Sequence, residues 1–317
     1  RHATRNFPNR EGSRPGEGQL AGVALMDARS IAATAARGGL LAAADEEPVT
    51  IRERDCRFDG EVYRNRVYQG FGRPEPEHEL RFGPNIADWP ALPALPRHLL
   101  LKVASFITDP VTTTDELIPS GETSSYRSNP PRLAEFTLQR RDPGYVARAK
   151  AAREPELIRE KGGNPATGHP ELAAALARAA KASGLKLDPA EVGLGSALHA
   201  AKPGDGSARE QAASCQKVLG GWANLAREYA TKRYRSNLIN WGILPLVLEG
   251  EPPYGLASYI FIPEARKAVL EDGARLTAYA LEEGGTREFS VTLGVLTPDE
   301  RRILAAGCLI NFYREGN

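Results

Sequence analysis

Residues 204–212 read Gly-Asp-Gly-Ser-Ala-Arg-Glu-Gln-Ala (GDGSAREQA). The two glycines allow a tight turn and a close approach of the backbone to a ligand. A helix is predicted from Ser207 to about Leu219, and its first N–H groups would point at whatever lies in the loop. The positive end of that helix would also stabilise a negative charge on Ser207. With a short strand expected over 192–198, the stretch predicts a strand, a glycine loop and a helix.

The same stretch has a purely structural interpretation. Ser207 and Glu210 have the spacing of a capping box, in which the two side chains only start a helix. Arg209, one turn into the helix, would present a planar fork to a carboxylate. Both interpretations of Ser207, as a reactive group and as a cap, stay open at this point.

Strands and helices are mixed along the chain, which predicts an α/β domain with a mixed sheet. An alanine-rich stretch over 20–44 predicts a helix that stops at Gly38-Gly39. Further strands are expected at 99–103, 258–262, 276–281 and 289–295, and helices at 145–160, 170–183 and 298–312. Residues 108–131 are expected to form a loop, because they are rich in Thr, Asp, Pro, Ser and Gly.

Composition divides the chain into three parts. Residues 1–47 hold a polar, basic loop and the alanine-rich stretch, and residues 48–94 are rich in Pro, Gly and charge with little periodicity. The middle part is therefore expected to be a linker between domains. Residues 95–317 would form the α/β domain.

Overall composition narrows the class of protein. Of 317 residues, 41% are hydrophobic and 26% charged, which is typical of a globular protein and excludes a disordered chain. The 41 Lys and Arg nearly balance the 40 Asp and Glu, so nucleic acid is an improbable partner. No apolar run approaches the roughly 18–20 residues of a membrane span. Cys56, Cys215 and Cys308 lie far apart, which predicts neither disulfides nor a metal knuckle and suits the cytoplasm.

Other polar residues are candidates for an anion site. Arg5 and Arg10 flank a short loop and could clamp a di- or tricarboxylate, or simply be solvated. Asp115 could be a carboxylate partner in the site or a helix N-cap. Arg127 follows Tyr126 in a polar loop, where it could bind an anion or face water.

Taken together, these segments resemble the aconitase superfamily, in the family's own order and over nearly the whole chain. The elements that carry the resemblance are Thr4-Arg5-Asn6-Phe7-Pro8-Asn9-Arg10 for N-R-N-F-x-x-R, Thr113–Gly121 for T-T-D-H-I-S-P-A-G, Tyr126-Arg127 for a substrate-binding Y-R or F-R, Gly204–Ala212 for G-E-G-S-S-R-E-H-A, Asn240–Leu246 for N-x-G-L-L-P-L, and Ala305–Leu309 for A-G-S-A-L.

The resemblance implies a fold and a domain order. Residues 1–47 would be the tail of the family's third domain, 48–94 the interdomain linker, and 95–317 the swivelling fourth domain of β/β/α type. Family members hold a [4Fe–4S] cluster on three cysteines, two of them in a C-G-P-C motif that is absent from this chain. The expected partner is therefore the set of missing N-terminal domains 1–3, in the same chain or a separate fragment. The chain alone is expected to be inactive.

The resemblance also implies roles for single residues. Ser207 would be the general base of a hydro-lyase, removing a proton from the carbon next to a carboxylate. The Ala208 N–H and Arg209 would hold charge beside it. Carboxylates of a hydroxy di- or tricarboxylate substrate would bind Arg5, Arg10 and Arg127, and Asp115 would support the site. The cluster iron, in the missing part, would accept the departing hydroxyl.

Four positions depart from the family's pattern and indicate a divergent hydratase branch. Gln211 and Glu116 each replace a histidine, Thr4 stands where asparagine is usual, and Ala208 replaces the second serine. An alternative function is a non-catalytic relative that serves only as a carboxylate-binding or interaction module. An enzyme should require Ser207, whereas a binding module should tolerate its loss and depend only on the arginines.

Overall fold

The computed structural model describes residues 25–46, 57–61, 72–73, 76–77, 79, 81–271 and 275–316. The chain forms two compact units, which divide between Phe82 and Gly83. The expected domain boundary at residue 95 stays a prediction. No helix in the described ranges is both long enough and apolar enough to cross a membrane.

The first unit contains helix α1 (Ala28–Ala36). Its N-terminus is capped by Asp27, whose carboxylate accepts hydrogen bonds from the backbone N–H of Arg29 at 2.9 Å and of Ser30 at 3.1 Å. After the helix, Gly38 and Gly39 both have positive φ, at 66° and 96°. The helix with a glycine stop that the sequence predicts here is confirmed.

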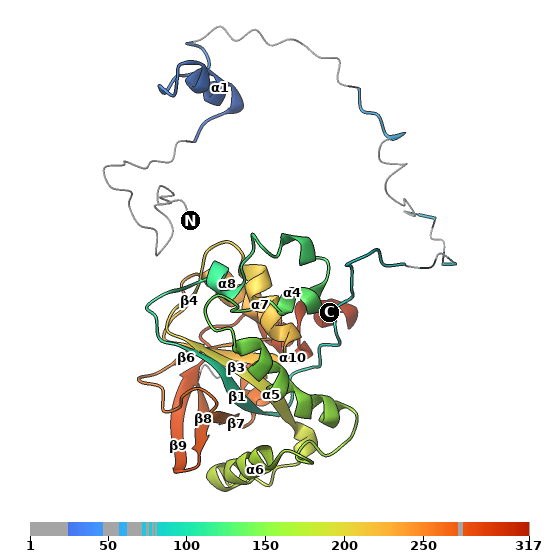
Figure 1. The fold of residues 1–317 in the computed structure, drawn as a ribbon, viewed down its shortest axis with the longest axis vertical. Helices are drawn as coiled ribbons and strands as arrows, with labels where there is room; N and C mark the ends of the chain where they lie inside the picture. Colours follow the sequence, from blue (N-terminus) through green and yellow to red (C-terminus); the bar gives the residue numbers. More distant parts are fainter. Residues whose placement is uncertain are drawn as a thin grey trace. The chain divides into compact units, whose positions relative to one another are not determined.

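The second unit contains a mixed sheet, which confirms the predicted α/β class (Figure 1). Within the described residues, seven strands join in the order β1-β3-β5-β6-β9-β8-β7, and β7 pairs back with β1 so that the sheet closes on itself. The pairs among β1, β3, β5 and β6 are parallel and the others antiparallel. The strands are β1 (His98–Ile107), β3 (Val192–Ala200), β5 (Gly221–Ala226), β6 (Leu244–Leu248), β7 (Tyr259–Ile262), β8 (Arg275–Glu282) and β9 (Gly285–Thr292). A separate short pair is formed by β2 (Thr112–Thr113) and β4 (Pro203–Asp205).

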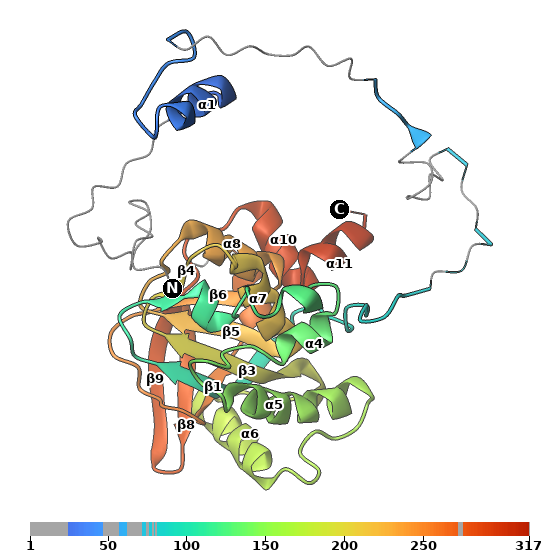
Figure 2. The ribbon, with the colours of Figure 1, turned by 45° about the horizontal axis from the view of Figure 1, so that its top comes forward.

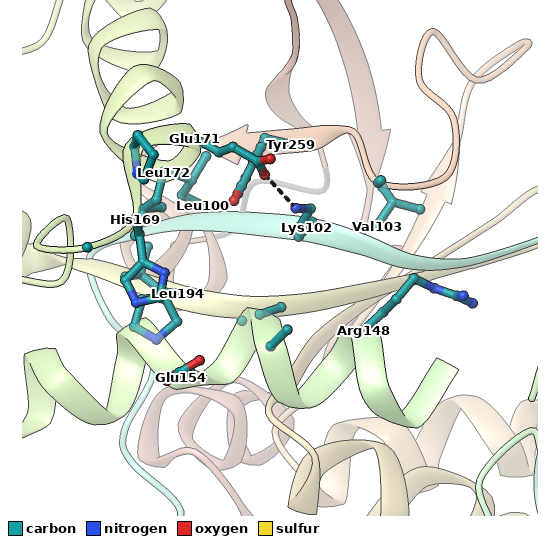
Figure 3. A pocket seen from close by; sticks show the side chains of 17 residues that line it. Leu100, Lys102, Val103, Arg148, Glu154, His169, Glu171, Leu172, Leu194 and Tyr259 are labelled. Atoms are coloured by element: carbon teal, nitrogen blue, oxygen red, sulfur yellow. Dashed lines mark hydrogen bonds and ion pairs between the residues drawn. The ribbon is translucent and has the colours of Figure 1, made fainter. Parts of the chain in front are cut away.

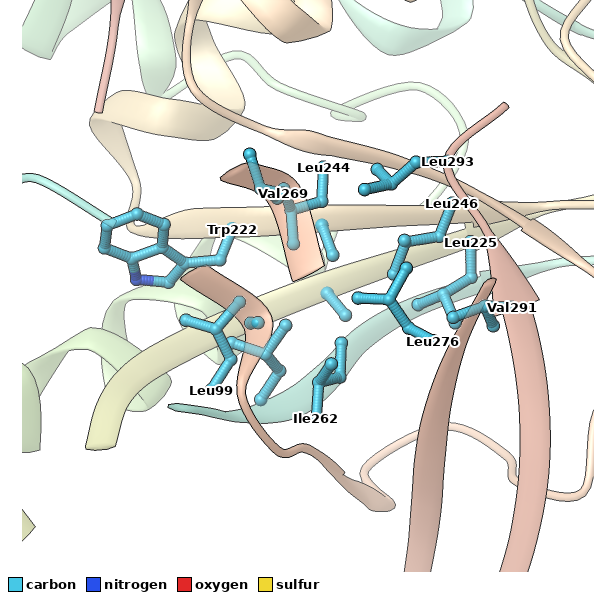
Figure 4. Packing of buried hydrophobic residues seen from close by; sticks show 14 of the residues in the cluster. Leu99, Trp222, Leu225, Leu244, Leu246, Ile262, Val269, Leu276, Val291 and Leu293 are labelled. Carbon is cyan, nitrogen blue, oxygen red and sulfur yellow. The ribbon is translucent and has the colours of Figure 1, made fainter. Parts of the chain in front are cut away.

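Apolar side chains fill the inside of the closed sheet (Figure 4). Strand β1 shows why: it is buried almost continuously, because one face points inward and helices cover the other. The inward set includes Leu99, Leu225, Leu246, Ile262, Leu276 and Val291. Burial of these side chains is the main force that closes the sheet.

Helices pack against the outside of the sheet in two groups (Figures 1 and 2). In one group α5 packs on β1 and β3, α7 on β5 and α8 on β6, while α4 packs on α7. In the other, α6 packs over Leu100 of β1 and on β8. The helices of the second unit are α3 (Thr114–Leu117), α4 (Pro130–Ala134), α5 (Tyr145–Glu160), α6 (Pro170–Ser183), α7 (Arg209–Val218), α8 (Lys232–Asn240), α9 (Ala265–Leu270), α10 (Pro298–Ala306) and α11 (Leu309–Arg314).

Most predicted elements are confirmed, and the exceptions have physical causes. The helix expected over 298–312 is instead two helices, because Gly307 adopts φ +91°, and a Cβ at this position would overlap the Pro93 carbonyl. Strand β5, with the sequence Gly-Trp-Ala-Asn-Leu-Ala, was not predicted. It has weak intrinsic strand preference and is held by its place between β3 and β6. Inside the expected loop 108–131 the chain forms β2 and α3.

A lysine lies in the interior of the second unit. Lys217 of α7 is only 4% exposed, and its Nζ donates to the Gly242 carbonyl at 3.2 Å. The Trp222 ring centroid lies 3.5 Å from the same Nζ. Burial lowers the pKa of Lys217 to about 7, because the charged form loses its hydration.

This shift predicts how stability depends on pH. Between pH 7 and about 10.4 the unfolded chain binds a proton at Lys217 that the folded chain does not, so the free energy of unfolding should rise with pH in this window. From pH 7 to pH 9, wild type should gain roughly 2 kcal/mol relative to Lys217→Met. Urea unfolding at both pH values measures this, with the exposed Lys181→Met as control. Parallel pH profiles for wild type and Lys217→Met would contradict the assignment.

Candidate functional site

The candidate site lies where β2 and β4 pair. The two strands are parallel, with Thr112 opposite Pro203 and Thr113 opposite Asp205. Helix α3 follows β2 directly, and the Gly206-Ser207 turn follows β4 and leads into α7. The pairing therefore brings Asp115 and Ser207, which are 92 positions apart in the sequence, onto neighbouring segments.

Two glycines are required for this approach. Gly204 has φ +101°, and a side chain there would overlap the ring of Tyr234. Gly206 has φ +128°, and a Cβ at this position would overlap Oγ1 of Thr114. Both φ values lie in the region that only glycine adopts without strain. The glycines therefore let β4 and its turn sit directly against α8 and α3.

Ser207 does not cap α7, so the capping-box interpretation of Ser207 and Glu210 is wrong. The helix begins at Arg209, its N-cap is Ala208, and no side chain caps it. Glu210 instead accepts hydrogen bonds from Trp241 Nε1, at 2.5 Å, and from Asn237 Nδ2. Among the described residues, none hydrogen-bonds to the Ser207 hydroxyl, and Ser207 is exposed at the tip of the turn.

Ala208 and Arg209 are both tied to the turn. The Ala208 N–H donates to Thr114 Oγ1 over 3.3 Å. The Arg209 guanidinium folds back and donates from Nη1 to the Gly206 carbonyl. Arg209 therefore stiffens the glycine turn in addition to placing a cation beside Ser207.

Asp115 and Glu116 differ in their roles. Glu116 belongs to a capping box with Thr113: the Thr113 N–H and hydroxyl each donate to Glu116 Oε2 at 2.7 Å. Asp115 is exposed in the first turn of α3 and accepts from Arg140 Nη1 at 3.0 Å. Arg140 also pairs with Glu122, and the two carboxylates together raise the pKa of Arg140. The cap of α3 is thus Thr113, and the Asp115 carboxylate is left for an ion pair at the edge of the site.

Of the three arginines predicted to clamp substrate carboxylates, the structure describes Arg127. Arg127 is exposed after a single 3₁₀ turn (Ser124–Tyr126), and it has no ion pair with any residue in the described part of the chain. Tyr126 beside it stacks on Phe136, with ring centroids 5.2 Å apart. Arg5 and Arg10, the other two expected clamps, lie outside the described residues.

Two residues that position the site were not expected from the sequence. Thr114 is only 2% exposed, and its hydroxyl accepts the Ala208 N–H. Arg140 holds Asp115. The run Thr112-Thr113-Thr114 beside Asp115 was a signal for the first, because a buried threonine needs a hydrogen-bond partner. Nothing local marks Arg140, because its contact with Asp115 depends on the tertiary fold.

The cysteines do not form a metal centre in the described part of the chain. No group of three or more His, Cys, Asp or Glu side chains lies at metal-ligand spacing there. Cys215 and Cys308 are both buried as free thiols, and burial raises the pKa of Cys215 to about 12. Cys56 lies outside the described residues. These two thiols do not fit an iron–sulfur cluster, which is held by three or four convergent cysteine thiolates.

Residues 198–251, which include β4, the Ser207 turn, α7, β5, α8 and β6, match the family model described as the aconitase C-terminal domain. This part of the chain is therefore similar to the aconitase C-terminal domain. Among solved structures, the chain is similar to 3-isopropylmalate dehydratase (LeuD) from Methanocaldococcus jannaschii, at 18% identity over 69% of this chain and 95% of that chain, with a TM-score of 0.42. No curated protein matches the sequence.

The packing of the glycine turn between β4 and α7 can be tested. Gly206→Ala adds both backbone strain and an overlap with Thr114, so it should lower the free energy of unfolding by about 2–4 kcal/mol. Gly250→Ala is the matched control: its φ is +85°, but no atom lies within 4 Å of a Cβ there, so it should cost about 1 kcal/mol. Urea midpoints at constant slope measure both. Equal losses would show that contact with Thr114 does not constrain the turn.

Proposed function

We propose that this chain supplies the swivel-type C-terminal domain of an aconitase-like hydro-lyase, which dehydrates and rehydrates a hydroxy di- or tricarboxylate of the citrate or isocitrate kind. The observation that carries the proposal is the state of Ser207. Its hydroxyl is exposed at the tip of a rigid glycine turn and is not used to cap the helix that follows. A serine with only a structural role there would donate or accept within the turn.

In this proposal Ser207 Oγ takes the proton from the carbon next to a substrate carboxylate. Two features of the domain favour a negative charge on this oxygen: the N-terminal end of α7, and the guanidinium of Arg209 two residues later. The Ala208 N–H now donates to Thr114 Oγ1 at 3.3 Å, and in this proposal it would exchange that partner for the negative charge at the site.

The substrate carboxylates bind arginines. Arg127 is exposed and has no carboxylate partner in the described ranges, so it can accept a substrate carboxylate without breaking an ion pair. Arg5 and Arg10 would complete the clamp from residues 1–47, the proposed tail of the preceding domain. Asp115 supports the site by holding Arg140 at its edge.

The [4Fe–4S] cluster of the family would act as a Lewis acid on the departing hydroxyl. Because Cys215 and Cys308 do not fit it, we place its ligands in companion domains 1–3, on the same polypeptide or a separate one, with 48–94 as the linker. The chain alone would then be inactive. We also propose a cytoplasmic location, in keeping with the free thiols.

The structure places two of the residues that depart from the family's pattern, Glu116 and Gln211. Glu116, in place of a histidine, is used in the capping box that starts α3. Gln211 lies in the first turn of α7 behind Ser207, where a histidine would have been able to carry a proton. A site with the base and the cations but without these two histidines supports a divergent branch, with a substrate that differs from citrate in its polar groups.

Loss of Ser207 should lower the turnover number, whereas loss of Arg127 should weaken substrate binding. In the full-length protein with its cluster, Ser207→Ala should lower kcat about 100-fold or more with little change in KM. Arg127→Gln should mainly raise KM, by about 10-fold or more, because a charge-assisted pair with the substrate is lost. The assay follows the ultraviolet absorbance of the unsaturated acid, with cis-aconitate as the first probe.

Matched controls are available on the same domain. Ser236→Ala and Arg314→Gln remove the same groups at exposed positions outside the β2–β4 site and should leave both constants unchanged. Iron–sulfur absorbance near 400 nm establishes that the cluster is present in each sample. If Ser207→Ala retains full turnover, Ser207 is not the base. If wild type shows no turnover, and its ligand affinity survives Ser207→Ala but is lost with the arginines, the domain is a binding module.

A further inference from the structure

A cavity of about 420 Å³ lies on the outside of the sheet between α5, α6 and the strands β1, β3 and β7. We propose that it binds a small apolar monocarboxylate, such as an aliphatic acid. None of the residues that line it belongs to β2, β4, α3 or α7, so it is separate from the Ser207 site. Its volume lies in the range of small-molecule pockets in proteins.

The floor of the cavity is apolar. Leu100 of β1 and Leu194 of β3 lie opposite each other in the parallel register, and Leu172 of α6 packs beside them. Pro155 of α5 adds a fourth buried wall. These side chains offer a hydrocarbon chain a surface from which water is readily displaced.

One cation stands over this floor. Figure 3 shows Lys102, Glu171 and Tyr259 together along one side of the cavity. The Lys102 Nζ donates to Glu171 Oε2 at 3.0 Å and lies 5.1 Å from the centroid of the Tyr259 ring. Burial alone would lower the pKa of Lys102, but the hydrogen bonds to Glu171 and Tyr259 outweigh it and raise the pKa. Lys102 is therefore a permanent positive charge at neutral pH.

The carboxylate that now pairs with Lys102 is exchangeable. The side chain of Glu171 is 77% exposed, whereas that of Lys102 is 29% exposed. An ion pair with one partner this exposed contributes little stability, because water competes for the carboxylate. A ligand carboxylate inside the cavity would take the same place on Lys102 while its hydrocarbon part covers the floor, and Glu171 would turn out into solvent.

The remaining charged groups set the charge of the ligand. Arg148, at the other end of the cavity in Figure 3, is already held by Asp142 and by the Ala104 carbonyl. Glu154 and His169 lie at the end opposite Arg148. With one cation whose partner can leave, and an acidic side chain nearby, the cavity favours a single negative charge. A di- or tricarboxylate would place a second charge against Glu154 or on the apolar floor.

Octanoate is a suitable probe for this proposal, with 1-octanol and octylamine as matched neutral and cationic probes. Calorimetric titration of the 317-residue chain should show saturable binding of octanoate with a Kd of roughly 1 mM or lower. The two other probes should bind at least ten times more weakly, because neither can pair with Lys102. Ser207→Ala should bind octanoate like wild type, which separates this site from the proposed catalytic one.

Four variants test the site itself. Lys102→Met should weaken octanoate binding about tenfold or more, and Ala152→Phe should do so by filling the cavity from α5. Glu171→Gln should tighten binding two- to fivefold, since it removes the competing carboxylate. Lys150→Met, which removes a lysine of α5 that does not line the cavity, should change nothing. Unfolding midpoints of each variant show whether the fold is retained.

The binding measurements either support the site or overturn it. Loss of binding in Lys102→Met and Ala152→Phe, with a gain in Glu171→Gln, supports the site. Absence of saturable octanoate binding to wild type overturns the proposal. Equal binding of octanoate and 1-octanol, or unchanged binding in folded Lys102→Met, would also overturn it, because Lys102 would then take no part.

Discussion

The buried hydroxyl and ring of Tyr234 connect the elements on which the candidate site depends. The hydroxyl accepts hydrogen bonds from Gln216 of α7, at 2.9 Å, and from Asn224 of β5, at 3.0 Å. The ring lies directly against Gly204 of β4, where no side chain would fit. One side chain of α8 thus fixes the strand before the Ser207 turn, the helix after it and the next strand of the sheet. Burial also raises the pKa of Tyr234, so the hydroxyl stays protonated.

Different parts of the second unit provide its stability and position its candidate site. The apolar interior of the closed sheet supplies most of the burial, and the polar contacts around Tyr234 specify where β4 and α7 lie. The Ser207 turn then needs no capping side chain, because Thr114, Tyr234 and Arg209 hold it from three directions. A serine freed in this way from the backbone is available for chemistry, which is why the proposed function rests on it.

The helices that lie in the sequence between the two halves of the site create the second feature of the domain. Helices α5 and α6 lie side by side on the outer face of the sheet, and the cavity forms where they part over β1 (Figure 3). Lys102 reaches this cavity because β1 points alternate side chains inward and outward. Leu101, the residue before it, faces the apolar interior instead. A ligand there would touch α5, whose first residue, Tyr145, packs in the same cluster as the Ala212 methyl of α7.

Local sequence determined much of this protein. The periodicity of α5 and α6, the glycine stop after α1 and the apolar run of β1 depend on neighbours within one element, so they could be read directly. The glycine turn and its serine were likewise visible, since only glycine tolerates those φ values. The aconitase-like order of motifs extended this to the class of the domain.

Tertiary structure decided the rest, because it depends on contacts between residues far apart in the chain. The spacing of Ser207 and Glu210 fits a capping box equally well. That role is excluded by the start of α7 at Arg209 and by the hydrogen bonds that Trp241 and Asn237 donate to Glu210. Strand β5 has weak intrinsic preference and exists because β3 and β6 pair with it. The pairing of Lys102 with Glu171 joins residues 69 positions apart. Sequence therefore determined which groups are present, and the closing of the sheet determined which of them meet.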